Sequence, residues 1–277
     1  MFVLTGFKEK RQGKEAAFST EEVHFCDIGL LRKSNQDSVF VFQSPGFALF
    51  LIADGMGGHL HGEMAAQAVS GAFSDWCDHF CIEKFKENFD QILEEISVVI
   101  ERINLRIYSE WNQDGICGTT LTLLAFFKNQ FAVINVGDSR IYRKKALHFN
   151  QITTDDIWEN RIEAESGIQM RKGLMKSARG KLTAAVGVKK SIIPGRSTDV
   201  VHRKEFFFLC SDGVYKCCDE RLFDKVARRL SFSSDKDTLS DCLQDIRDQI
   251  YRSGAPDNAS GILVKIIRRD WIHEFFD

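Results

Sequence analysis

The stretch Ala53-Asp-Gly-Met-Gly-Gly-His-Leu-His-Gly-Glu63 joins an apolar run to a helical pattern. The apolar run covers residues 47–53, and the helical pattern begins at Glu63. A strand therefore delivers Asp54 to a turn whose glycines allow backbone conformations barred to other residues and a close approach to an ion or a phosphate. The alternative is a flexible turn that contains an aspartate, because Asp and Gly are common loop residues.

An apolar strand pattern with an aspartate at its end occurs elsewhere along the chain as well. Apolar strand patterns also end next to Asp138 and Asp212, while Asp37 and Asp257 each stand just ahead of a strand pattern. Five carboxylates that converged at strand ends would repel one another and lose hydration, which is unfavourable unless cations neutralise them. Convergence of these residues with Asp54 therefore implies a metal site.

The type of ligand indicates the type of metal. Carboxylates, backbone carbonyls and water suit hard octahedral ions such as Mg²⁺ or Mn²⁺. His59 and His61 form a His-x-His pair that is an alternative transition-metal ligand set. The other interpretation of that pair is two solvated or locally hydrogen-bonded side chains in a polar loop.

Composition limits the class of protein. The chain has 277 residues, of which 44% are hydrophobic and 27% charged, as in soluble globular proteins. A net charge of −2 gives no electrostatic reason to expect nucleic acid as a partner. No apolar run approaches the ~20 residues of a membrane span, so we expect a cytoplasmic protein. The eight cysteines are dilute and are expected to be reduced thiols, several of them buried.

Strand and helix patterns alternate in blocks. Short strands joined by tight turns predict an antiparallel sheet, and two consecutive helices with broad apolar faces predict a helix pair packed on a β layer. We expect strands at 23–28, 38–43, 47–53, 118–127, 131–136, 141–143, 206–210 and 260–267, and helices at 63–80, 89–111, 157–166, 220–230 and 239–250.

One catalytic domain over residues 23–267 is the simplest organisation, because no linker-like shift in composition interrupts it. Residues 1–22 are expected to form an arm or an edge segment, and 268–277 a tail. Residues 155–181 are irregular, with Asp155 and Asp156 expected to cap a short helix. This segment is either a flap over the site or a plain surface insertion.

Six motifs in this chain resemble, in order, those of the type 2C metal-dependent protein serine/threonine phosphatases, in the form typical of the bacterial branch. The motifs are Arg32-x-x-Asn-Gln-Asp37, Asp54-Gly-Met-Gly-Gly-His-x-x-Gly-Glu63, Gly118-Thr-Thr120, Gly137-Asp-Ser-Arg140, Ser211-Asp-Gly213 and Asp257-Asn258. The resemblance implies an α+β fold, a four-layer αββα sandwich in which two central antiparallel sheets are flanked by helix pairs.

The resemblance also implies a binuclear Mn²⁺ or Mg²⁺ site. Asp54 would bridge both ions and Gly55 would offer its carbonyl to one of them, while Asp212 and Asp257 would complete the other. Asp37 would lie in contact with an ion or one water away. The bridging water, acidified to hydroxide, would attack phosphorus directly.

Further residues follow from the same motifs. Arg32 matches the residue that grips the substrate phosphoryl group, and Asp138 matches, with Asp212, a third and weaker metal site of some members. Met56 and Lys216 depart from eukaryotic relatives, which have a histidine and an acidic residue there. We therefore expect the proton for the leaving group to come from a metal-bound water, with His59 or His61 as the alternative source.

The implied function is hydrolysis of phosphoserine and phosphothreonine on proteins in cytoplasmic signalling. The expected partners are phosphorylated proteins, including a serine/threonine kinase or its substrates, with no role for nucleic acid or membrane. Two alternatives are a catalytically silent regulatory domain of the same fold and a phosphatase of small phosphoesters. Clustered carboxylates argue against the silent domain, because such a domain has no need of them.

Overall fold

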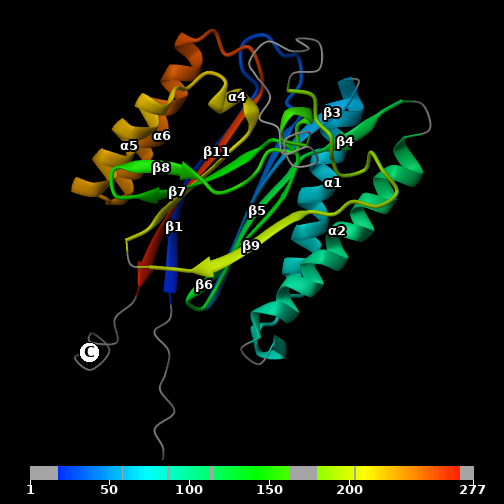
Figure 1. The fold of residues 1–277 in the computed structure, drawn as a ribbon, viewed down its shortest axis with the longest axis horizontal. Coiled ribbons are helices and arrows are strands. Elements are labelled where there is room, and N and C mark those ends of the chain that lie inside the picture. Colours follow the sequence, from blue (N-terminus) through cyan, green and yellow to red (C-terminus); the bar gives the residue numbers. More distant parts are fainter. Residues whose placement is uncertain are drawn as a thin grey trace, which may run out of the picture.

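Four layers make up the structure, in which two antiparallel sheets stacked face to face lie between two pairs of helices (Figure 1). The computed structural model describes residues 18–268 except 58, 86–87, 113–114, 162–179 and 203. The arrangement confirms the predicted αββα sandwich of the α+β class.

The first sheet has five strands. They are β1 (Phe18–Asp27), β7 (Arg140–Lys145), β8 (His148–Gln151), β10 (Phe206–Cys210) and β11 (Ala259–Arg268). Their order is β1-β11-β10-β7-β8, and every neighbouring pair is antiparallel. The first and last described strands of the chain therefore lie side by side.

The second sheet has six strands. They are β2 (Asp37–Ser44), β3 (Phe47–Gly57), β4 (Cys117–Thr119), β5 (Leu121–Phe127), β6 (Gln130–Val136) and β9 (Gly195–Val200). The order is β2-β3-β5-β6-β9, with β4 paired to the end of β3. The β2–β3 and β5–β6 hairpins confirm the pairings predicted from the alternation of strands and turns.

The apolar run of β3 is continuous because both faces of the strand are covered. Leu49 and Leu51 pack into the cluster between the second sheet and its helices. Phe50 and Ile52, which point the other way, pack between the two sheets against residues such as Phe207. A strand in the middle of a sandwich therefore reads as an unbroken hydrophobic segment that runs to Asp54.

Helices cover the outer face of each sheet. On the second sheet lie α1 (His59–Asp78) and α2 (Phe89–Trp111), and on the first lie α5 (Glu220–Phe232) and α6 (Lys236–Arg252). The short helices are η1 (Ile82–Phe85) and α4 (Asp212–Tyr215). Side chains cap the long helices: Asn88 accepts the Asp90 and Gln91 amides at the start of α2, and Asp235 accepts the Thr238 amide in α6.

Three expectations from the local sequence pattern were wrong. The antiparallel sheet predicted from short strands joined by tight turns does not include the first of them with β2 and β3, because β1 lies in the other sheet against β11. The helix expected from Glu63 begins at His59, so the second half of the glycine-rich stretch belongs to α1. Asp212 does not lie in a turn, since it opens α4 with Ser211 at the N-cap position.

The predicted terminal segments fall partly within the described residues. Residues 18–22, assigned to an arm or edge segment, form the start of the edge strand β1. Residues 1–17 and 269–277 lie outside the described residues, as do 162–179 of the flap-like segment. All eight cysteines are free, five of them buried, in agreement with the prediction.

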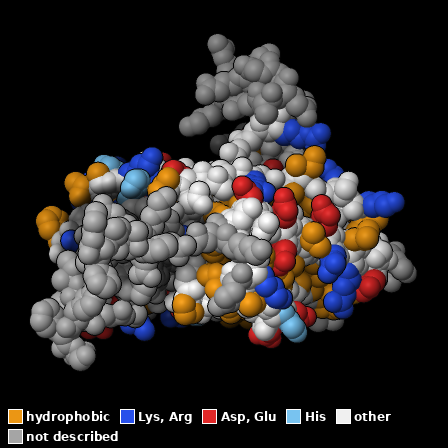
Figure 2. Space-filling view, turned by 90° about the horizontal axis from the view of Figure 1, so that it is seen from below, with side chains coloured by type: hydrophobic (Ala, Val, Ile, Leu, Met, Phe, Trp, Pro, Cys, Tyr) orange, Lys and Arg blue, Asp and Glu red, His pale blue; other side chains and the backbone are white. Residues whose placement is uncertain are grey.

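The surface of the described residues shows mixed charge at the end remote from α4. Figure 2 views the molecule from that end, and basic, acidic and hydrophobic side chains are intermixed over the coloured area.

None of the helices that the structure describes is both long and apolar enough to cross a membrane.

Candidate active site

A cavity of about 520 Å³ lies at the end of the sandwich where β3 finishes and α4 begins. Six of the predicted site residues line it, namely Arg32, Asp54, Gly55, Asp138, Asp212 and Asp257. Residues far apart in the sequence thus meet at one place, as predicted from the repeated strand-to-aspartate pattern. Asp37 lies behind the cavity wall, directly opposite Asp54 in the β2–β3 pair.

Asp54 is held by its backbone and lies in a strongly negative environment. The Asp54 amide donates to the Thr120 hydroxyl at 2.9 Å, and the Thr120 amide donates to the Asp54 carbonyl at 2.8 Å. Burial first, and then the charges of Asp37 and Asp212, raise the pKa of Asp54 well above its ordinary value. This carboxylate therefore needs a positive charge close to it.

Gly55 must be a glycine because the chain crosses another segment there. A Cβ atom at this position would lie 2.1 Å from the Gly62 carbonyl oxygen at the start of α1. The Gly55 amide also donates to the Gln36 carbonyl at 2.9 Å. Glycine thus allows β3, α1 and the segment before β2 to meet at the cavity.

Asp37 is buried with one carboxylate oxygen unsatisfied. Its Oδ2 accepts a hydrogen bond from the Ser211 hydroxyl at 2.8 Å, whereas Oδ1 has no partner among the described residues. Burial, with a contribution from the charge of Asp212, raises the pKa of Asp37 to about 7. An orphaned carboxylate oxygen beside a cavity is the kind of group that a water or a cation satisfies.

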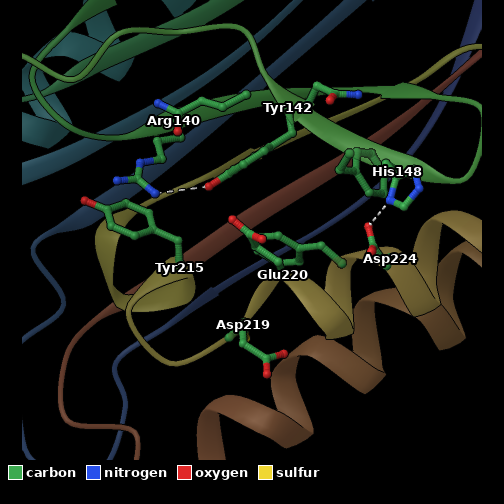
Figure 3. A pocket seen from close by; sticks show the side chains of 12 residues that line it. Arg140, Tyr142, His148, Tyr215, Asp219, Glu220 and Asp224 are labelled. Carbon is green, nitrogen blue, oxygen red and sulfur yellow. Dashed lines mark hydrogen bonds and ion pairs between the residues drawn. The ribbon is translucent and has the colours of Figure 1, made fainter.

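Asp138 is supported from behind by an aromatic side chain that the sequence analysis missed. The Tyr215 hydroxyl donates to Asp138 Oδ2 at 3.2 Å. The Arg140 guanidinium lies beside the Tyr215 ring, 3.6 Å from its centre (Figure 3). Burial, and then the charge of Asp212, raise the pKa of Asp138 to about 6. Tyr215 gave no sequence signal beyond standing three residues after Asp212.

The acidic pair at the start of the flap-like segment has a different role from the predicted helix cap. Asp155 accepts from Arg140 Nη2 at 2.7 Å and from Arg140 Nε at 3.0 Å. Asp156 accepts the Gly137 amide at 2.9 Å. Both carboxylates therefore fasten the base of this segment to the loop that carries Asp138.

Asp257 forms an ion pair with Arg32. Both distances, from Nη2 to Oδ2 and from Nε to Oδ1, are 2.8 Å, which is a bidentate geometry. Asn258 holds the Arg32 loop beside it, since its side chain accepts the Gln36 amide and donates to the carbonyls of Ile28 and Ser34. The predicted phosphoryl-binding residue thus lies next to a predicted metal ligand.

Asp212 forms an ion pair with Lys216, which also lines the cavity. Asp257 and Asp212 are therefore both bound to basic side chains. Among the residues that the structure describes, no three His, Cys, Asp or Glu side chains are arranged to hold one ion.

The two alternative metal ligands and proton donors are His59 and His61. His61 is absent from the described lining of the cavity, and the side chain of His59 lies outside the described residues. Met56, whose side chain carries no titratable proton, lines the cavity.

The residues present fit a hard divalent cation. The lining contains carboxylate side chains and the backbone of Gly55, and Mg²⁺ and Mn²⁺ prefer oxygen donors of these kinds. Mutual repulsion helps to raise the pKa of Asp37, Asp54 and Asp138, so added positive charge would be stabilising here.

A four-layer αββα sandwich with a carboxylate-lined cavity at one end is the architecture that the six sequence motifs implied. The chain belongs to the protein phosphatase 2C family, because the model of that family matches residues 32–248.

Named relatives agree with this assignment. Serine/threonine protein phosphatase PstP of Mycobacterium tuberculosis is 26% identical over 249 residues, covering 88% of this chain and 45% of that protein. Serine/threonine phosphatase stp of Listeria welshimeri is 27% identical over 247 residues, covering 86% of this chain and 93% of that protein. The chain thus spans less than half of the mycobacterial relative and nearly all of the listerial one.

Solved structures share the fold. The serine/threonine phosphatase of S. agalactiae matches with a TM-score of 0.75 at 25% identity, covering 89% of this chain and 99% of that one. The catalytic domain of PstP, solved in complex with two manganese ions, matches with a TM-score of 0.71 at 24% identity. The match covers 90% of this chain and 99% of that one.

Proposed function

We propose that this chain hydrolyses phosphoserine and phosphothreonine on proteins with two divalent cations, Mn²⁺ or Mg²⁺. The observation that carries the proposal is the meeting of four carboxylates and Arg32 on one cavity. The names of the relatives support the substrate class, and the two manganese ions in the PstP structure support the metal.

The ligand set is the one that the family resemblance implies, and its members line the cavity. Asp54, the Gly55 carbonyl, Asp212 and Asp257 would hold the two ions. Asp37 would reach an ion through water, which its unpartnered Oδ1 would bind. When bound, the two ions would lower the pKa of a shared water and so supply the nucleophile for direct attack on phosphorus.

The side chains of the protein itself bind and orient the substrate. Arg32 has a planar pair of donors, which matches two oxygens of a phosphoryl group. Both donors bind Asp257 in the structure, so Arg32 would release this carboxylate when it binds substrate. Thr120 fixes the direction of Asp54 through two hydrogen bonds to its backbone. Met56 has no titratable proton, so the leaving oxygen takes its proton from water in the cavity.

A phosphate-release assay on a phosphothreonine peptide tests the proposal. We expect release to require Mn²⁺ or Mg²⁺ and to be abolished by Asp54→Ala and by Asp212→Asn. The matched control is Asp241→Asn, which removes an exposed carboxylate paired with Arg229. Full activity in either site variant would refute the metal assignment.

The same preparations decide between this proposal and the two alternatives. A folded protein that binds no Mn²⁺ in calorimetry would be a silent regulatory domain. Faster turnover of a sugar phosphate or nucleotide than of a phosphoprotein would make it a small-phosphoester phosphatase. Action on a serine/threonine kinase or its substrates in the cytoplasm stays a prediction.

A further inference from the structure

Lys216 is a basic side chain placed inside the carboxylate cluster. It lines the same cavity as Asp54, Asp138, Asp212 and Asp257. Its ammonium donates a hydrogen bond to Asp212 Oδ2, and the described residues donate none to Asp212 Oδ1. One oxygen of Asp212 is therefore taken by the protein itself, and one is left for an ion.

The position of this ammonium follows from the backbone. Lys216 is the C-cap residue of α4, and its amide donates to the Asp212 carbonyl at 3.0 Å. Residues four apart on a helical turn lie on the same face, so the two side chains meet without any rearrangement. The ion pair is thus part of the local fold of α4.

Lys216 also lies near Asp138. The two residues line the same cavity, and Tyr215, the residue before Lys216, donates a hydrogen bond to Asp138 Oδ2 at 3.2 Å. Two neighbouring carboxylates are stabilised by a cation between them. Lys216 supplies one such positive charge to both.

Among the residues that the structure describes, the charged groups at the cavity can be counted together with Asp37 behind its wall. The acidic groups are Asp37, Asp54, Asp138, Asp212 and Asp257, and the basic groups are Arg32, Lys181 and Lys216. Five negative and three positive charges leave two negative charges. Two divalent ions would make the centre doubly positive, which complements a phosphoryl dianion, whereas a third ion would leave a large excess of positive charge.

We propose that the Lys216 ammonium takes the place of a third cation between Asp138 and Asp212, so that this centre binds two divalent ions and excludes a third. This inference rests on the proposed function. It makes Lys216 a residue that sets the number of ions.

Counting Mn²⁺ on the full chain tests the inference without any assay of activity. Isothermal titration calorimetry and the electron paramagnetic resonance signal of free Mn²⁺ would give the stoichiometry for four proteins. These are the wild type, Lys216→Met, Lys216→Glu and the control Lys225→Met, which removes an exposed lysine paired with Asp245 on the helix pair. The Met variant removes the charge without adding an oxygen ligand.

We expect two ions in the wild type and in Lys225→Met. Lys216→Met should bind a third, weaker ion, and Lys216→Glu should bind that ion about tenfold more tightly, within the usual range for coupled sites. Circular dichroism of each protein checks that it is folded.

Three ions in the wild type would overturn the inference, and this result needs no variant. Two ions in a folded Lys216→Met would overturn it as well, even if Lys216→Glu gained a third, because a new carboxylate ligand alone would then explain the gain. In both cases the proposed function would stand. No ion in any of the four proteins would instead refute the proposed function, and this inference with it.

Discussion

Thr120 binds the backbone of Asp54 on both of its polar groups, through its hydroxyl to the amide and through its amide to the carbonyl. Thr120 is 2% exposed, and its hydroxyl lies 3.0 Å from that of Ser139. The Gly118-Thr-Thr120 motif therefore orients the carboxylate of Asp54 from the junction of β4 and β5.

Removing the Thr120 hydroxyl should weaken both the fold and the site. In Thr120→Val the Asp54 amide would lose its buried acceptor, which costs about 1–3 kcal/mol of the free energy of unfolding. Phosphatase activity should fall with it, because Asp54 is less well oriented. Urea denaturation and kcat would be measured against Thr120→Ser, which keeps the hydroxyl; equal stability of the Val and Ser variants would contradict this role.

Neutralising Asp54 should stabilise the protein while it abolishes activity. Asp54 accepts no side-chain hydrogen bond from the described residues and is repelled by four other carboxylates. In chelator, Asp54→Asn should therefore unfold with a free energy about 1–2 kcal/mol higher than the wild type. Added Mn²⁺ should raise the melting temperature of the wild type far more than that of the variant.

The control for this prediction is Asp245→Asn, which removes a carboxylate from an exposed pair with Lys225 and should not raise stability. A melting temperature for Asp54→Asn below that of the wild type in chelator would show that repulsion does not dominate at this site.

Breaking the pair between Arg140 and Asp155 should destabilise the protein more than breaking a surface pair. The Asp155 side chain is 5% exposed, so Arg140→Gln would leave a buried charge without its partner. We expect a loss of about 3 kcal/mol in chemical denaturation. Arg229→Gln, which breaks the exposed pair with Asp241, should cost under about 1 kcal/mol. Similar losses in the two variants would contradict the structural role of Arg140.

Asp27 should make stability depend on pH. Burial raises its pKa, but hydrogen bonds from the Gly29 amide, Arg247 and Tyr251 outweigh this and leave it below the ordinary value. A depressed folded-state pKa stabilises the fold above the unfolded value of about 3.9, and this contribution is lost as the pH falls through the folded value.

The free energy of unfolding of Asp27→Asn should therefore lie below that of the wild type at neutral pH. The difference should stay constant down to about pH 5 and shrink below about pH 4. Urea denaturation over this range, with Asp224→Asn for comparison, would measure it. If the difference in free energy of unfolding between Asp27→Asn and the wild type grew in acid, the depressed pKa of Asp27 would be refuted.

Much of the fold and site could be predicted because the relevant signals are local. The continuous apolar run of β3, the β5–β6 hairpin and the stripe of α2 each follow from a period within one segment. The predicted Asp138, Asp212 and Asp257 reach the cavity for the same reason, since each stands at the end of a recognisable strand.

Other predictions failed where a partner distant in the chain decides the outcome. Asp155 and Asp156 looked like a helix cap, but Arg140 and Gly137 bind them instead. Tyr215 had no pattern of its own, and its contact with Asp138 exists only because α4 packs beside the loop after β6.

The printed sequence was therefore sufficient to name the layers, the carboxylates and the family that they resemble, because hydrophobic period and motif order are properties of neighbouring residues. It could not show that β1 belongs to the first sheet, where Cys26 of β1 pairs with Ser260 of β11. Nor could it show that Arg32 and Lys216 each hold a predicted metal ligand. Strand pairing and ion pairs of this kind depend on how the whole chain packs, and local periodicity does not encode them.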